Sequence, residues 1–317
     1  MSKEKKTVII TGGNTGLGYE CAKVIAKANN DWHIVLASRN KERINKAAQE
    51  LIQTTGNQHI SGMVVDLASF SSIHHFVHQF NEAGLPPLHS IICNAGVQFV
   101  QGTQATVDGI EATFGVNHLG HFLLVRLLLN QIQDHGSIVV VSSDTHDPLM
   151  KTGMPAPIYL DPSIMANPQK SDESLANLSS LSRGQTRYTT SKLCNLYFSY
   201  ELARRIEKAN RLITVKAFNP GMMPGRGSSL SRDYNPVLKF MWNNVLPLMR
   251  FFRSSIRSTQ QSGTDLANLL LNQRFSSSGQ YFDGPKEIPS SKESYDIGRA
   301  KKLWSWSSNF LGLNENV

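Results

Sequence analysis

Short apolar runs and longer amphipathic stretches alternate along most of this chain. The runs are rich in β-branched residues, as in buried parallel strands, and lie at Thr7–Thr11, His33–Ala37, Ile60–Val65, Ser90–Cys93, Ser137–Val141, Ile213–Phe218 and Gly279–Phe282. The stretches repeat their apolar positions every three to four residues, as helices do, and lie near Gly16–Ala28, Lys41–Thr54, Phe70–Glu82, Gly109–Leu129, Arg187–Lys208 and Thr259–Leu271. Right-handed crossovers between such strands build a parallel sheet. The pattern predicts an α/β fold with a doubly wound, mostly parallel seven-stranded sheet.

No linker divides the chain, so residues 1–317 are predicted to form a single domain. Two segments break the alternation of strands and helices. Residues 144–185 are rich in Pro, Ser and Asn and are longer than an ordinary loop, so we interpret them as an insert. Residues 219–258 follow the sixth strand and contain two lipophilic runs, Val237–Trp242 and Val245–Phe252. We expect both segments to form walls of a substrate site at the carboxyl ends of the strands, with 219–258 as a lid.

Charge and composition restrict the classes of partner. The net charge is +8, but charged residues are only 18% of the chain, and no run of Lys or Arg is interleaved with aromatic residues. We therefore expect no nucleic-acid binding. The positive charge suits an anionic ligand or an anionic membrane surface instead. Cys21, Cys93 and Cys194 are scattered, with no His at metal-ligand spacing, which indicates a reducing compartment and no metal site.

The apolar segments predict a cytoplasmic protein. Met1–Lys6 is charged and leads directly into the first strand, without the apolar core of a signal peptide. Arg126 interrupts the most apolar run, Phe122–Leu129, which is therefore not expected to cross a bilayer. The run Val237–Phe252 leaves two uses open. It suits a lid over an apolar substrate, or a shallow membrane anchor whose cations reach anionic headgroups, which would make the protein membrane-peripheral.

A glycine-rich turn follows the first strand and opens the first helix. It contains Gly12, Asn14, Thr15, Gly16, Leu17 and Gly18. Glycine permits tight backbone dihedrals and a close approach of the backbone to a pyrophosphate, while the helix N-terminus stabilises the phosphates. The turn therefore predicts a dinucleotide site of the Rossmann type. Its spacing, Gly-x-x-x-Gly-x-Gly, differs from the wider Gly-x-Gly-x-x-Gly fingerprint.

The residues after the second strand favour NADP(H) over NAD(H). NAD-binding units place an Asp or Glu there to accept a hydrogen bond from the ribose 2′-hydroxyl. Here the strand leads into Ser38-Arg39-Asn40-Lys41, which contains no carboxylate. The Arg39 guanidinium can bind a 2′-phosphate through two hydrogen bonds and stack on adenine. The alternative is an ordinary surface arginine in a loop before a helix.

Tyr188 and Lys192 lie four residues apart on a predicted helix, so the phenol and the ammonium share one helix face. Together with the glycine turn they belong to seven ordered motifs that resemble the short-chain dehydrogenase/reductase family over residues 7 to about 283. The motifs are Thr11-Gly12-x-x-x-Gly16-x-Gly18, Asp66-Leu67, Asn94-Ala95-Gly96, Asn117, Ser142-Ser143, Tyr188-x-x-x-Lys192 and Pro220-Gly221. Three segments resemble one branch of this family, which contains retinol dehydrogenases and light-dependent protochlorophyllide reductases. These segments are Gly115–Leu124, Ser191–Asn195 and Ala300–Trp304.

The resemblance implies hydride transfer between a nicotinamide and a carbonyl or alcohol carbon. It implies that Tyr188 exchanges a proton with the substrate oxygen, and that Lys192 activates the phenol and binds the nicotinamide ribose. Ser143 would orient the substrate oxygen, and Asn117 would hold a water that links Lys192 to solvent. The predicted cofactor-binding residues beyond the glycine turn are Ser38, Arg39, Asp66, Leu67, Asn94, Ala95, Gly96, Tyr188, Lys192, Pro220, Gly221 and Met222. Asp66 and Asn94 also suit turns on their own.

The main prediction is an NADPH-dependent oxidoreductase for a lipophilic carbonyl or alcohol, and two alternatives stay open. One is light-driven reduction of a tetrapyrrole double bond, and the other is an NADP(H)-binding protein without turnover, which the intact set of four catalytic residues disfavours. Protochlorophyllide reductases usually carry a cysteine where this chain has Met222, and a thioether is no acid. The insert before Tyr188 is expected to cover the helix face through which many family members dimerise, which predicts a monomer.

Overall fold

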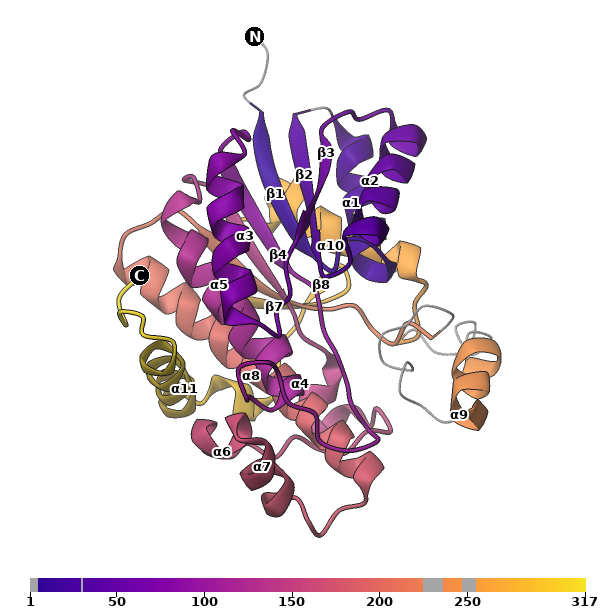
Figure 1. The fold of residues 1–317 in the computed structure, drawn as a ribbon, viewed down its shortest axis with the longest axis vertical. Helices are drawn as coiled ribbons and strands as arrows, with labels where there is room; N and C mark the ends of the chain where they lie inside the picture. The colour runs from indigo at the N-terminus through magenta and orange to yellow at the C-terminus, as the bar shows by residue number, and fades with distance from the viewer. Residues whose placement is uncertain (1–4, 30, 225–235, 247–254) are drawn as a thin grey trace.

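The computed structural model describes residues 5–29, 31–224, 236–246 and 255–317. These residues form one eight-stranded sheet in the order β3-β2-β1-β4-β5-β6-β7-β8 (Figure 1). Neighbouring strands are parallel except for the last pair, which is antiparallel. The strands are β1 (Lys6–Thr11), β2 (Trp32–Ser38), β3 (Ile60–Val64), β4 (Leu88–Cys93), β5 (Ser137–Val141), β6 (Thr214–Asn219), β7 (Gln280–Asp283) and β8 (Lys286–Glu287). The strand order reverses between β1 and β4, where ligands bind in such sheets.

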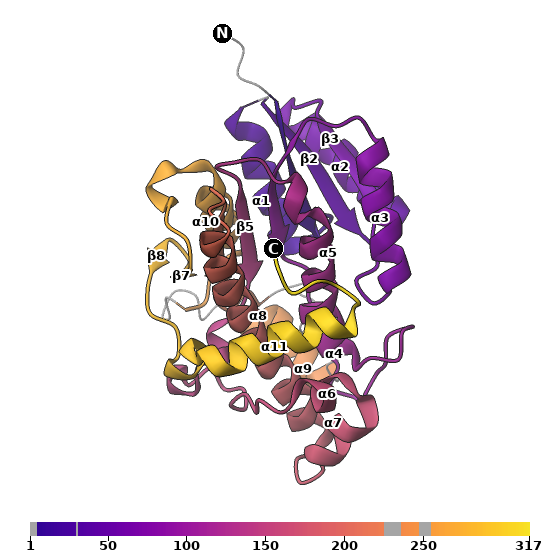
Figure 2. The same cartoon turned by 90° about the vertical axis from the view of Figure 1, so that its left-hand side faces the viewer.

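Helices cover both faces of the sheet. Helices α1, α2 and α10 pack on one face, and α3, α5 and α8 pack on the other (Figures 1 and 2). On β1, Val8 and Ile10 contact the first layer and Ile9 the second, because successive side chains of a strand alternate between faces. The helices are α1 (Gly16–Ala28), α2 (Lys41–Thr55), α3 (Phe70–Glu82), α4 (Ala112–Phe114), α5 (Gly120–Leu128), α6 (Pro162–Ala166), α7 (Pro168–Ser174), α8 (Ser180–Lys208), α9 (Pro236–Phe240), α10 (Thr259–Leu271) and α11 (Ile297–Phe310).

The predicted fold class is confirmed, with one added strand, two helices whose bounds differ from those predicted, and helices that were not predicted. Strand β8 was not expected, since only two residues pair with β7 after a turn at Gly284. The helix predicted at Gly109–Leu129 is divided into α4, a π-helical stretch at Gly115–Leu119, and α5. Helix α8 begins earlier than expected, at Ser180, because the Ser179 side chain caps it by accepting from the Ser182 N–H.

The apolar helix through the centre of the protein is a core element. Residues Ala112–Gln131 are long and apolar enough to cross a membrane by length and composition, which differs from the expectation based on Arg126. However, 89% of their most apolar window is buried inside the protein. The Arg126 guanidinium lies over the rings of Phe122 and Trp304. A helix that is buried to this extent is a core helix, which here lies between the sheet and the outer helices.

Helix α11 is the main element that the sequence analysis missed. It lies across α5 and α8 in Figure 2 and buries Ala300, Leu303 and Trp304. The Trp304 ring stacks on Phe198 of α8 at 6.2 Å between centroids. The insert 144–185 also contacts α8, where Asp172 pairs with Arg187. The covering of α8 is therefore shared by insert and tail rather than made by the insert alone, and the monomer stays a prediction.

The structure describes the whole of the predicted insert but only part of the predicted lid. The insert 144–185 contains α6, α7 and short helical turns, and it is not a structureless loop. Of the predicted lid 219–258, residues 225–235 and 247–254 lie outside the described residues. Helix α9 and the π-helical stretch Met241–Val245 are its described centre.

Candidate active site

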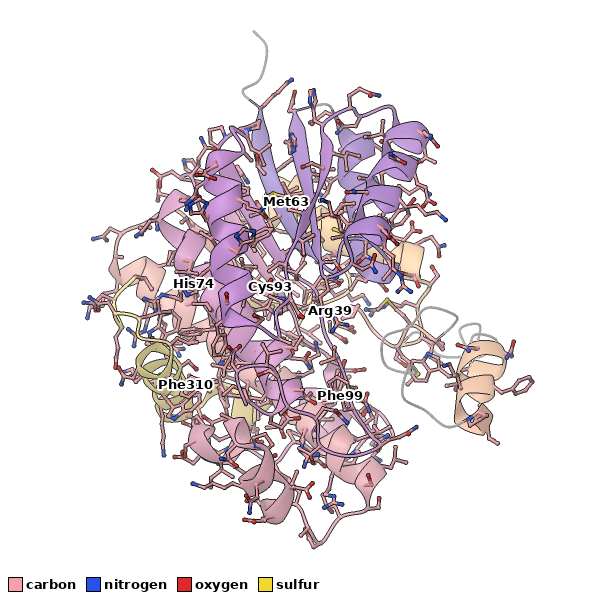
Figure 3. All side chains as sticks on the ribbon, viewed as in Figure 1. Arg39, Met63, His74, Cys93, Phe99 and Phe310 are labelled. Carbon is pink, nitrogen blue, oxygen red and sulfur yellow. The ribbon has the colours of Figure 1, made fainter. Side chains whose placement is uncertain are left out.

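A cavity of about 540 Å³ opens at the carboxyl ends of the strands, which is a normal size for a small-molecule site. Figure 3 labels Arg39 and Cys93, which mark the ends of β2 and β4 at this edge. The predicted site residues that line the cavity are Gly12, Asn14, Thr15, Gly16, Leu17, Ser38, Arg39, Asp66, Leu67, Asn94, Ala95, Gly96, Ser143, Tyr188, Lys192, Pro220, Gly221 and Met222. Gly18 and Asn117 are absent from the lining and lie behind it.

The glycine turn is shaped by backbone geometry. Gly12 and Gly16 have φ values of +64° and +57°, in the left-handed region that favours glycine. At Gly18 an added Cβ would stand 2.6 Å from the Gly12 carbonyl oxygen and 2.6 Å from the Asn94 amide nitrogen. Gly18 is therefore required for close packing between helix and strand, and not for contact with a ligand.

The start of α1 fits the phosphates of a nicotinamide dinucleotide. The N-cap residue, Thr15, makes no capping hydrogen bond with its side chain, so the first N–H groups of the helix have no side-chain partner. Nothing lies within 4 Å of an ideal Cβ on Gly16, which leaves room for a ligand beside the turn. A helix N-terminus with such space attracts phosphate oxygens through its N–H groups and its dipole.

Tyr188 and Lys192 project from α8 into the same cavity. They are 7% and 3% exposed, and the Lys192 Nζ lies 5.4 Å from the centre of the Tyr188 ring. The ammonium donates to the carbonyl oxygen of Val141, at 3.1 Å. Burial lowers the pKa of Lys192 to about 8. A lysine in this state carries a positive charge beside the phenol below that pH.

Asn117 is hydrogen-bonded to protein groups, and the water predicted beside it stays a prediction. Its Nδ2 donates to the Val97 carbonyl oxygen and to the Ser191 hydroxyl, and its Oδ1 accepts from the Val97 N–H. Both amide hydrogens are therefore used within the protein. An added Cβ on Gly96 would lie 3.5 Å from Asn117 Oδ1 and 3.7 Å from Lys192 Nζ. A water in contact with both groups would have to accept from Lys192 and donate to Oδ1.

The two serines after β5 have separate functions. The Ser142 hydroxyl is buried and donates to the Lys192 carbonyl oxygen at 2.8 Å, so it fixes α8 against the sheet. The Ser143 hydroxyl lines the cavity, donates to Asp144 Oδ1 at 3.1 Å and accepts from the Thr145 N–H. Burial raises the pKa of Asp144. Both serines line the cavity, but the Ser142 hydroxyl is committed to the Lys192 carbonyl oxygen, and the role of Ser143 toward the substrate stays a prediction.

Thr11 and His121 connect the glycine turn to the backbone at Asn117, and the sequence analysis assigned them no such role. The Thr11 hydroxyl accepts from the N–H groups of Asn94 and Ala95 and lies 2.9 Å from His121 Nε2. The other ring nitrogen, Nδ1, lies 3.2 Å from the Asn117 carbonyl oxygen. A carbonyl only accepts, so Nδ1 carries the proton and Nε2 accepts from Thr11.

The tautomer is consistent with the burial of the ring. Burial lowers the pKa of His121 to about 4, so the imidazole is neutral at physiological pH. The Ile92 carbonyl oxygen is a more distant acceptor for the single Thr11 proton, at 3.3 Å. Only a hydroxyl-bearing residue at position 11 and a histidine four residues after Asn117 signal this network in the sequence.

Replacing His121 by phenylalanine is expected to loosen the cofactor end of the cavity. The change leaves the Thr11 hydroxyl and the Asn117 carbonyl without this partner, at a cost of about 1–3 kcal/mol in the free energy of unfolding. The affinity for the nicotinamide dinucleotide, measured by calorimetry, should fall by about fivefold. His118→Phe is the matched control, since His118 contacts Ser307 instead. An equal loss of affinity in both variants would contradict the connection.

The loop after β6 is held by hydrogen bonds to β7 and to residues before α10. Gly221 has a φ of +74° and donates its N–H to the Asn219 side chain. The Met222 N–H donates to the Ser255 carbonyl oxygen, and the Met222 carbonyl oxygen accepts from the Arg257 N–H. Arg257 pairs in turn with Asp283 at 2.8 Å. Met222 is thereby fixed with its side chain lining the cavity.

The remaining walls come from the two segments that interrupt the alternation. The insert and the start of α8 contribute Met154, Leu181 and Gln185, and the segment after β6 contributes Met241, Trp242 and Leu246, among others. These side chains are mainly apolar, so this part of the cavity suits an apolar ligand. No group of three or more His, Cys, Asp or Glu residues that could hold a metal occurs within the described ranges.

Comparison with known proteins identifies the family. A family model described as short chain dehydrogenase matches residues 6–152, and one described as AcuH dehydrogenase domain matches residues 227–317. Protochlorophyllide reductase A from Oryza sativa is 32% identical over 96% of this chain and 80% of its own length. The human WW domain-containing oxidoreductase is also 32% identical, over 96% of this chain and 68% of its own length.

Solved structures show the same fold. An uncharacterised protein from Mycobacterium paratuberculosis has a TM-score of 0.69 at 23% identity, over 99% of this chain and 96% of its own. The 3-ketoacyl-(acyl-carrier-protein) reductase from Brucella melitensis, complexed with NADH, has a TM-score of 0.58 at 18% identity, over 94% of this chain and 100% of its own. With the glycine turn, Tyr188 and Lys192 gathered in one cavity, the chain belongs to the short-chain dehydrogenase/reductase family of nicotinamide-dependent oxidoreductases.

Proposed function

We propose that this protein is an NADPH-dependent reductase for lipophilic carbonyl compounds. The observation that carries the proposal is that Tyr188 and Lys192 share one mainly apolar cavity with Arg39 and an uncapped helix N-terminus. The first pair supplies acid–base chemistry, and the second pair supplies a site for a phosphorylated dinucleotide. The test is the formation of an alcohol from a lipophilic aldehyde in darkness, with NADPH as the hydride donor.

In this proposal the protein moves one proton and positions the substrate. NADPH, when bound, supplies the hydride. The Tyr188 hydroxyl donates its proton to the carbonyl oxygen, and the Lys192 ammonium stabilises the phenolate that remains. The low exposure of both residues strengthens this interaction between charges. The Ser143 hydroxyl turns its single hydrogen from Asp144 Oδ1 to the same oxygen and keeps that oxygen within reach of the phenol.

The preference for NADPH rests on charge near β2. Arg39 is exposed, lines the cavity and forms no ion pair with another residue in the ranges that the structure describes. Only Asn40 lies between Arg39 and α2, which begins at Lys41, and the Asn40 side chain caps that helix. No carboxylate therefore stands at the end of β2 to accept from a ribose hydroxyl, and the guanidinium is available for a 2′-phosphate.

Arg39→Ala should remove most of the preference for the phosphorylated nucleotide. The unmodified protein should bind NADPH more tightly than NADH by about 1.5–3 kcal/mol, the strength of hydrogen bonds to a charged group. In the variant NADPH affinity should fall to nearly the NADH value, with NADH affinity unchanged. Lys41→Ala is the matched control, because it removes a neighbouring positive charge and keeps the Arg39 guanidinium. Calorimetry that finds equal affinities in the unmodified protein would refute this assignment.

The lipophilic substrate is proposed from the apolar residues of the cavity wall. Met154 and Leu181 come from the insert and the start of α8, and Met241, Trp242 and Leu246 come from the segment after β6, all lining the cavity. Methionine side chains adapt to irregular apolar shapes, and a tryptophan presents a wide flat surface. Such walls favour a ligand with a large apolar part, and Thr145, Thr152 and Gln185 are polar residues of the same lining.

A second candidate is light-driven reduction of a tetrapyrrole, which the likeness to protochlorophyllide reductase A favours. The apolar walls would suit a planar pigment as well as an aliphatic or isoprenoid chain. Met222 lines the cavity, and its thioether has no proton to donate. Tyr188 is then the proton donor in either reaction, so the two candidates differ in substrate and in the need for light.

A further inference from the structure

Helix α9 and the π-helical stretch Met241–Val245 form a continuous helical segment with two apolar faces. Trp242 is buried and lines the cavity, and Leu246, four positions later, lines it as well. On the outside, Val237 and Phe240 are 70% and 63% exposed. In Figure 1 α9 stands away from the sheet and its covering helices. Val237 and Phe240 thus expose two large apolar side chains on a helix that stands outside the globular body, which suits a docking surface.

The exposed face has the spacing of an amphipathic helix. Val237 and Phe240 lie three positions apart, and Met241, 46% exposed, follows Val237 at four positions, so the three share one side of the helix. Met241 also reaches the cavity. The exposed cation in this segment is Lys239, and residues 236–246 contain no acidic residue.

Charge selects the partner for this face. Between positions 225 and 256 the sequence has five cationic residues and one acidic residue, in a chain whose net charge is +8. An aromatic and aliphatic helix face with a cation beside it, here Lys239, in a basic stretch of sequence is the pattern of helices that lie in the headgroup region of anionic bilayers. A second copy of this chain would bring the same positive charge to the contact and is therefore disfavoured.

We propose that the outer face of α9, formed by Val237, Phe240 and Met241 with Lys239 beside it, docks on an anionic lipid bilayer. The opposite face of the same segment is a wall of the cavity. Docking therefore brings that wall next to the membrane, from which a lipophilic molecule can reach the cavity without crossing water. The docking itself does not depend on turnover.

Sedimentation with vesicles tests the contact directly. The unmodified protein should bind vesicles of phosphatidylcholine with phosphatidylserine, and binding should weaken with salt and without phosphatidylserine. The double variant Val237→Ser, Phe240→Ser should bind at least about 30-fold more weakly, because two large apolar side chains no longer enter the lipid. Lys239→Glu should also weaken binding. Phe310→Ser on α11 is the matched control, since Phe310 is 46% exposed and lies on the side of the molecule away from α9 (Figure 3).

A label at the helix distinguishes insertion from other contacts. Cys21, Cys93 and Cys194 are buried, so Phe240→Cys offers a selectively reactive thiol for an environment-sensitive dye. Its emission should shift to shorter wavelength with anionic vesicles, and Phe310→Cys should show no shift. Absence of vesicle binding by the unmodified protein, or equal binding by the double variant, overturns the proposal. Dimers that dissociate in the double variant would assign the face to a second copy instead. None of these readouts requires activity, so their failure is separable from failure of the proposed reaction.

Discussion

Replacing Tyr188 by phenylalanine is expected to lower the rate of carbonyl reduction by about 10²- to 10⁴-fold. The phenol is the only acid that we assign to the substrate oxygen, and phenylalanine removes the hydroxyl while it keeps the ring. The ring lies 5.4 Å from the Lys192 ammonium, so the contact between ring and cation is retained. NADPH affinity should therefore change by less than about threefold, as measured by calorimetry beside steady-state kinetics.

Tyr197→Phe is the matched control for the loss of a buried phenol on the same helix. Tyr197 donates its hydroxyl to the Glu293 carbonyl oxygen and does not line the cavity. This variant should lose stability and keep its turnover. Near-normal turnover in Tyr188→Phe would show that another group protonates the substrate.

The rate of carbonyl reduction should fall as the pH rises through about 8. Burial lowers the pKa of Lys192 to about 8, so the ammonium is present below that pH and is lost above it. Without the positive charge the phenolate of Tyr188 is no longer stabilised, and the barrier to proton transfer increases. The profile of kcat/KM against pH reports this group in the free enzyme. Lys192→Met should reduce both turnover and NADPH affinity, and should abolish this limb of the profile.

Lys216 provides a control, because its pKa is lowered as far as that of Lys192 but its side chain lies outside the cavity. Burial also lowers its pKa to about 8, but its Nζ donates to Ser137, Thr214 and the Leu269 carbonyl oxygen, away from the cavity. Lys216→Met should leave the pH profile of activity unchanged. Because the unfolded chain keeps the Lys216 proton up to pH about 10.5, this side chain should contribute a rise in the free energy of unfolding between pH 8 and 10.5. That rise should be smaller in Lys216→Met, and a shifted activity profile would contradict the assignment to Lys192.

Periodicity alone was sufficient for the parallel sheet. The β-branched runs at β1, β2 and β5 are buried on both faces, and such runs differ clearly from the amphipathic helices between them. Helix α11 was missed because its buried residues, Ala300, Leu303 and Trp304, contact distant parts of the chain. The division of the helix at Gly115 was also missed, since tertiary contacts decide where a π-helical stretch forms.

The site was predictable where short motifs carry the chemistry. Gly16, Tyr188 and Lys192 have spacings that follow directly from a helix start and a helix face, and the structure places them in one cavity. The Thr11–His121 contact joins positions far apart in the sequence, and no local pattern indicates it. The partners of Asn117 depend on Val97 and Ser191 in the same way. Long-range hydrogen bonds therefore limited the prediction more than residue identity did.

The central claim is dark reduction of a lipophilic carbonyl with NADPH, and one assay tests it most directly. The protein is incubated in darkness with NADPH and a long-chain or isoprenoid aldehyde, and the alcohol product is quantified against the loss of NADPH absorbance. We expect equal amounts of alcohol formed and NADPH consumed, and no chlorophyllide when protochlorophyllide and NADPH are illuminated with the same protein. A red-shifted chlorophyllide that forms only in light, with no alcohol formed in darkness, would contradict the claim and assign the protein to the photoreductases.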